Sequence, residues 1–190
     1  MILGMSIATS TLVHVIISLI GIVSGLIVLF GMFGSRRLPG WTALFLLTTI
    51  LTSVTGFMLP SVGLTPARIF GIISLLVLAA ALLAFYGFRL GGAWRWIYVG
   101  SAVLALYLNI VVLIVQAFLK IPFLHALAPT GTEPPSLIAE GVLLVIFLVF
   151  GLIALISFHP ERHAAAYALR ATALPRKRKR VAHPPTGCAP

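Results

Sequence analysis

Long apolar segments, separated by short turns rich in Gly, Pro and basic residues, make up most of the chain. Each segment holds about the 20 apolar residues that a helix needs to cross roughly 30 Å of hydrocarbon. Turn signals such as Leu38-Pro39-Gly40 mark where one segment stops and the next begins. The pattern predicts an all-α, polytopic membrane helical bundle. Its five transmembrane helices are expected at 11–33, 42–59, 67–88, 96–119 and 136–158.

Composition places this bundle in lipid. Apolar residues make up 61% of the 190 positions and charged residues 8%, against about 25% charged in an average soluble domain. A water-soluble globule is excluded, because its surface would need many more charged side chains. We expect residues 1–159 to form the transmembrane bundle and residues 160–190 to form a basic cytoplasmic tail that is partly disordered.

The basic residues predict the orientation. With five crossings, nearly all of the 13 Lys and Arg residues fall on the side that holds the C-terminus, and only Arg68 and Lys120 fall on the other. Because short basic loops stay in the cytoplasm, the N-terminus is expected outside and the C-terminus inside. Four aromatic residues fall at the proposed inner boundary, the depth that amphipathic rings prefer: Trp41, Trp94, Trp96 and Tyr98.

Small and hydroxyl residues form stripes on the first two helices. On the first, Ser18, Gly21 and Gly25 share a face with His14, which predicts close approach of another helix. On the second, three threonines form a stripe at helical spacing. Their hydroxyls are expected to serve packing more than a pathway, because they usually bond to carbonyls of their own helix. These threonines are Thr48, Thr52 and Thr55.

Polar residues along the fourth helix are expected to face the bundle, since a buried Asn or Gln without partners is costly. The predicted orientation then gathers most of the other polar and titratable side chains near the outer surface. Together they form a candidate polar vestibule composed of His14, Arg68, Asn109, Gln116, Lys120 and Glu140.

Two of these residues have alternative interpretations. Glu140 is either a carboxylate stabilised by the dipole near a helix N-terminus or a proton- or cation-binding group partnered by His14, Arg68 or Lys120. His14 is expected to be an interfacial histidine bonded to a loop, and the alternative is a ligand.

A basic run near the C-terminus predicts contact with anionic lipids at the cytoplasmic face. Nucleic-acid binding is the alternative, and we expect none, because a charge cluster tethered to a membrane already has a sufficient partner. The run consists of Arg176, Lys177, Arg178, Lys179 and Arg180.

Three segments resemble a family of small multi-pass bacterial inner-membrane proteins of unknown function. They are 51–57 (LTSVTGF), 106–109 (LYLN) and 120–135 (KIPFLHALAPTGTEPP). The similarity covers roughly residues 30–150 and implies a bacterial inner (plasma) membrane. It also makes the proline-rich loop 120–135 the expected specialised feature.

These patterns favour a non-enzymatic membrane protein that acts as an accessory or assembly subunit through helix–helix contacts with a membrane-protein partner or a second copy. The alternative is a small transporter or channel-like protein that uses the polar vestibule. We expect no enzymatic activity, cofactor or metal, because the sequence contains no zincin, nucleophile-elbow or phosphate-loop motif, and its one cysteine, Cys188, lies in the tail.

Overall fold

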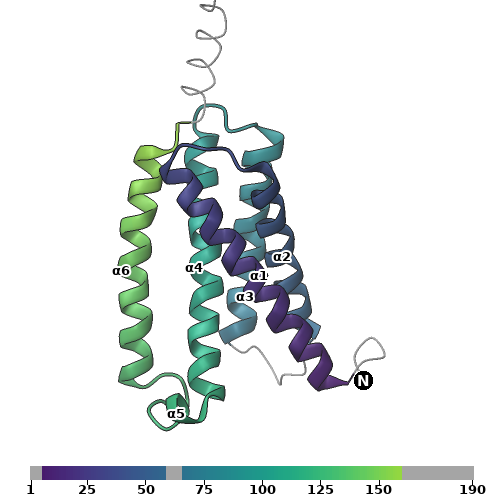
Figure 1. Ribbon diagram of the computed structural model, residues 1–190, viewed down its shortest axis with the longest axis vertical. Helices are drawn as coiled ribbons and strands as arrows, with labels where there is room; N and C mark the ends of the chain where they lie inside the picture. The colour runs from purple at the N-terminus through teal and green to yellow at the C-terminus, as the bar shows by residue number, and fades with distance from the viewer. Residues whose placement is uncertain (1–5, 59–65, 160–190) are drawn as a thin grey trace, which may run out of the picture. The chain divides into compact units, whose positions relative to one another are not determined.

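The computed structural model describes residues 6–58 and 66–159, which form helices joined by short connections (Figure 1). The helices belong to one compact unit, Met1–Phe158, and a second unit, His159–Pro190, lies almost wholly outside the described residues. The elements are α1 (Ile7–Phe33), α2 (Pro39–Met58), α3 (Pro66–Leu82), a π-helical turn η1 (Leu83–Gly87), α4 (Trp94–Lys120), α5 (Pro122–His125) and α6 (Pro134–Ser157).

Five of these helical segments are long and apolar enough to span a membrane, as the sequence predicts. Their bounds are Ile7–Phe33, Pro39–Met58, Arg68–Gly87, Trp94–Lys120 and Pro134–Ser157. The protein is therefore a multi-pass membrane protein. The direction in which it crosses the bilayer stays a prediction.

The helices begin earlier than predicted, for two local reasons. α1 starts at Ile7 because the hydroxyl of Ser6 caps it, accepting a hydrogen bond from the Thr9 N–H at 3.1 Å. α2 and α6 start on Pro39 and Pro134. Proline favours the first helical position, where its missing N–H has no partner to lose. Because proline also breaks helices, the sequence places these two starts a few residues too late, at 42 and 136.

Four helices form a ring, in which α1 packs on α2, α2 on α3, α3 on α4, and α4 on α1. α6 lies outside this ring, against α4 and α1 (Figure 1). The α1–α2 and α3–α4 connections meet at one end of the bundle, and the α4–α6 connection with α5 lies at the other (Figure 1). The two ends of the bundle are therefore formed by different connections.

The α3–α4 connection begins with a widened helical turn. In η1 the Phe88 N–H reaches the Leu83 carbonyl at 2.9 Å, five residues back, and the Leu90 N–H reaches the Ala84 carbonyl at 3.0 Å. Arg89 and Leu90 then adopt positive φ angles of 50° and 64°. These bonds satisfy carbonyls at the helix end and reverse the chain direction toward α4.

Candidate functional site

Two stripes of hydroxyl side chains run along α2. Thr48, Thr52 and Thr55 form one, and we call it the α1-facing stripe after the helix it meets. At about 100° per residue, a second stripe lies on the neighbouring sector of the same helix. We call it the α4-facing stripe; its members Thr42, Thr49 and Ser53 are all buried.

The α1-facing stripe holds His14. The Nδ1 atom of His14 lies 2.8 Å from the Thr55 hydroxyl oxygen, and that hydroxyl donates its own hydrogen to the Leu51 carbonyl at 2.7 Å. Which of the two groups donates in this bond depends on the tautomer of the imidazole ring. His14 is thus bonded to a transmembrane helix, whereas the sequence predicted a loop partner.

Glycines on α1 pack directly against side chains of α2. A Cβ atom built on Gly21 would lie 3.2 Å from the Thr48 hydroxyl oxygen, and one on Gly25 would lie 2.8 Å from a ring carbon of Phe45. The predicted small-residue stripe is therefore used within this chain. Ser18 does not bridge helices, because its hydroxyl donates to the Val15 carbonyl of α1 at 2.8 Å.

The α4-facing stripe bonds to α4 at two depths. Thr42 and the Tyr98 hydroxyl are 3.1 Å apart near the end that carries the α1–α2 connection, and both residues are buried. Near the middle of the bundle, Asn109 donates from Nδ2 to the Thr49 hydroxyl oxygen at 3.1 Å. Tyr98 therefore faces the interior of the bundle, as the polar face of the fourth helix predicts, and its depth relative to the membrane boundary stays a prediction.

Sequence reasoning missed the α4-facing stripe. The seven-residue spacing of Thr42 and Thr49 places both on one helix face, and that spacing could have identified them. Two further hydroxyls are buried without a hydrogen-bond partner among the described residues, those of Thr52 on α2 and Ser74 on α3. A buried hydroxyl usually has a partner, so these two are the exceptions in this interior.

The other vestibule candidates lie at the end of the bundle away from Tyr98. Lys120 is exposed and close enough to His14 for an electrostatic interaction. Glu140 accepts a hydrogen bond from the buried Ser136 hydroxyl of its own helix at 3.1 Å. Arg68 and Gln116 are half-buried at the same end. The convergence of these six residues on one vestibule stays a prediction.

Glu133 organises the proline-rich connection before α6. Its carboxylate accepts hydrogen bonds from the Thr130 N–H at 3.0 Å, the Thr130 hydroxyl at 2.9 Å and the Thr132 N–H at 3.1 Å. Desolvation acts to raise the pKa of Glu133, but these hydrogen bonds outweigh it and hold the pKa below its ordinary value. Glu133 is also the N-cap residue of α6, so Glu140 lies beyond the first turn of that helix.

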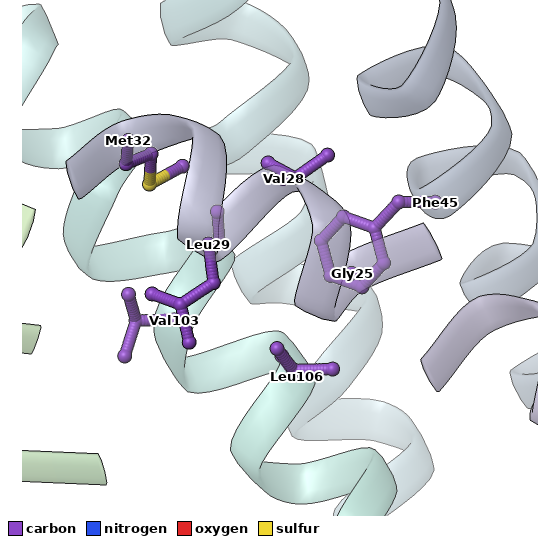
Figure 2. Close-up of a pocket in the computed structure, with 8 residues that line it drawn as sticks. Gly25, Val28, Leu29, Met32, Phe45, Val103 and Leu106 are labelled. Carbon is purple, nitrogen blue, oxygen red and sulfur yellow. The ribbon is translucent and has the colours of Figure 1, made fainter. Parts of the chain in front are cut away.

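An apolar crevice lies where α1 meets α2 and α4 (Figure 2). Its lining comes from three helices and consists of Gly25, Val28, Leu29, Met32, Phe45, Ala102, Val103 and Leu106. It is too narrow to admit a water molecule and has no polar lining. Because Gly25 has no side chain, three helices can meet at this crevice.

No family model, curated protein or solved structure matches the chain. Among residues 6–58 and 66–159, no three His, Cys, Asp or Glu side chains are placed to hold a metal ion. The basic run at 176–180 and the tail boundary at 160 lie outside the described residues, so the expected contact with anionic lipids stays a prediction.

Proposed function

We propose that this multi-pass protein is a non-enzymatic accessory or assembly subunit that works through helix–helix contacts with another protein in the bilayer. The resemblance to small multi-pass bacterial proteins supports the inner (plasma) membrane as its location. Anionic lipids at the cytoplasmic face belong to the same proposal as partners of the basic tail.

The observation that carries the proposal is the use of the interior polar groups. His14 bonds to Thr55, Asn109 to Thr49 and Tyr98 to Thr42, so three polar side chains on α1 and α4 hold these helices to α2. Hydrogen bonds of this kind, together with close glycine contacts, are how helices associate where no hydrophobic force acts between them. They support a rigid intramembrane module.

Contacts with a partner must then use the outer surface of the bundle. α6 offers a large part of that surface, since Leu148 is 64% exposed and several other aliphatic side chains on the same helix are also exposed. Substitutions at such positions change the outer face with little effect on the packed interior, which makes them suitable for a test.

The test is purification from native membranes in mild detergent, followed by native mass spectrometry. We expect a stable complex with a fixed stoichiometry, and we expect Leu148→Trp to weaken it while leaving the unfolding temperature unchanged. Leu76→Trp on α3, where Leu76 is 69% exposed, is the matched control. A protein that remains a monomer without a partner, in the wild type as well as in both variants, would contradict the proposal.

Transport is the second candidate function, and the two stripes of hydroxyl side chains on α2 together favour it. Polar side chains reach from Tyr98 near one end of α2 through Asn109 to His14 at the other, and the unpartnered Thr52 hydroxyl lies between them. A chain of hydroxyl and amide groups can conduct a proton or a small polar solute if water enters.

Proteoliposome flux separates the two candidates. Transport predicts flux that is lost in Asn109→Leu and in Glu140→Gln while the fold stays intact. The accessory function predicts no flux above that of empty liposomes, in the wild type and in both variants alike.

A further inference from the structure

One end of the bundle carries a concentrated positive charge. Arg36 and Arg37 lie in the α1–α2 connection and Arg89 lies in the α3–α4 connection, and all three side chains are exposed. The two acidic residues within the described part of the chain, Glu133 and Glu140, lie at the opposite end, on the α4–α6 connection and the start of α6. The arginines at this end therefore have no neighbouring carboxylate within the described residues.

A hydrogen bond joins the two connections. The Arg37 guanidinium donates from Nη2 to the Arg89 backbone carbonyl at 3.0 Å. A guanidinium has five N–H donors, so this contact fixes the position of Arg37 and leaves it further donors. It also places the Arg37 side chain beside Arg89.

The backbone of both connections is held in an uncommon conformation. Among the described residues, Ser35, Arg89 and Leu90 are the non-glycine residues with positive φ, and all three lie in these two connections. Bonds from the Arg36 N–H to the Gly31 carbonyl and from the Leu90 N–H to the Ala84 carbonyl, each 3.0 Å long, keep them there. Such conformations are uncommon outside glycine and cluster at functional sites. A fixed backbone also means that less conformational entropy is lost when the arginines bind a ligand.

The depth of these arginines matches that of lipid head groups. The α1–α2 connection lies between a span that ends at Phe33 and one that begins at Pro39, and the α3–α4 connection lies between Gly87 and Trp94. Each arginine therefore lies within a few residues of the hydrocarbon edge. Trp41 and Trp96 flank them with exposed rings, as is typical of the membrane interface. Their ligand would therefore be anchored in the bilayer.

We infer that Arg36, Arg37 and Arg89 form a binding site for the phosphate head group of an anionic phospholipid, built by the joined α1–α2 and α3–α4 connections. Planar guanidinium groups match the geometry of phosphate oxygens and bind them with paired N–H donors. This site is separate from the basic run at 176–180, and it does not depend on the accessory or transport function.

The site is tested on the full-length protein in mixed micelles that contain equal amounts of phosphatidylglycerol and phosphatidylcholine. Native mass spectrometry measures the ratio of the two lipids that stay bound. We expect a preference for phosphatidylglycerol, and we expect it to fall about fivefold for each arginine changed to glutamine, since each basic residue near the surface contributes about 1 kcal/mol.

Among the three single variants, Arg89→Gln disturbs the structure of the two connections least, because the backbone carbonyl that holds Arg37 remains in place. The triple variant Arg36→Gln, Arg37→Gln, Arg89→Gln gives the largest effect, and unfolding in phosphatidylcholine alone checks that it folds. Lys120→Gln removes one exposed charge at the opposite end and should leave the lipid ratio unchanged.

A fourth variant, with glutamine at positions 176–180, separates this site from the tail. We expect it to keep a preference for phosphatidylglycerol that the Arg89→Gln change then lowers. An unchanged ratio in a folded triple variant, or complete loss of the preference when the tail alone is neutralised, would overturn the inference.

Discussion

The α1–α2 interface and the α6 interface join helices in different ways. Between α1 and α2, glycines and hydroxyls bring the backbones close together, with Gly21 against Thr48 and His14 bonded to Thr55. α6 instead packs through rings, with Phe147 centred 5.8 Å from Tyr107 and Phe150 centred 5.7 Å from Phe33. In the most apolar stretch of α6, 11% of the residues are buried, whereas 33% are buried in the corresponding stretch of α1.

The difference shows two ways to stabilise helices in lipid. Small residues gain dispersion contacts by letting backbones approach, and a hydrogen bond between helices adds direction to the contact. Large rings instead fill the space between helices through edge-on and tilted contacts. We therefore expect the ring of α1–α4 to be rigid and α6 to be the more easily perturbed helix.

Gly25→Leu should have the largest effect on stability. The new side chain would meet Leu106 at 2.7 Å and the Phe45 ring at 2.8 Å, closer than the contacts of real Cβ atoms. Overpacking of this kind costs about 3 kcal/mol of unfolding free energy, measurable by detergent-induced unfolding in mixed micelles. Gly141→Leu on α6, where nothing lies within 4 Å, is the control. Equal losses in the two variants would remove the distinction between the interfaces.

Phe147→Ala should have an intermediate effect on the α6 interface. The ring is 6% exposed and contacts Tyr107 and Phe150. Removing it leaves a gap that neighbouring rings can partly fill, so we expect a loss of about 2 kcal/mol, less than the 3–5 kcal/mol of a fully buried Phe in a soluble core. Phe123→Ala, at a ring that is 75% exposed, should leave the unfolding free energy unchanged. A loss above that of Gly25→Leu would reverse the comparison.

His14→Ala should cost about 1 kcal/mol, the size of a typical interhelical hydrogen bond in a membrane protein. Gly21→Leu should lower the unfolding free energy and impair assembly more than His14→Ala does, because the new leucine side chain would displace Thr48. The two variants are compared by expression level, oligomer profile and unfolding. Equal results for both would argue against close glycine packing as the main stabilising contact.

Glu133→Gln should have the smallest effect, confined to the connection before α6. Since the folded-state pKa of Glu133 lies below its ordinary value of 4.5, its hydrogen bonds stabilise the connection at higher pH and are lost as pH falls through the lowered pKa. The chemical shift of the Thr130 amide should follow this titration in the wild type and lose it in the variant. A midpoint above 4.5 in the wild type would show that the carboxylate is not held as described.

Much of the bundle could be predicted from the sequence, because bilayer thickness sets the length of each apolar segment. The close packing of Gly21 and Gly25 also followed from their spacing on one face. The pairing of Thr42 with Tyr98 and of Thr49 with Asn109 did not. A stripe on a helix indicates that some neighbour is near, but which helix supplies the partner depends on the order of helices around the ring, and that order is a tertiary property.

Polar side chains inside the bundle hold its helices together. A double-mutant cycle between Thr49→Val and Asn109→Leu measures this contribution, because these residues join α2 to α4 at 3.1 Å in the middle of the bundle. We expect a coupling free energy of about 0.6 to 1.7 kcal/mol in the unfolding measurements. Strictly additive losses, with no coupling between the two sites, would contradict it.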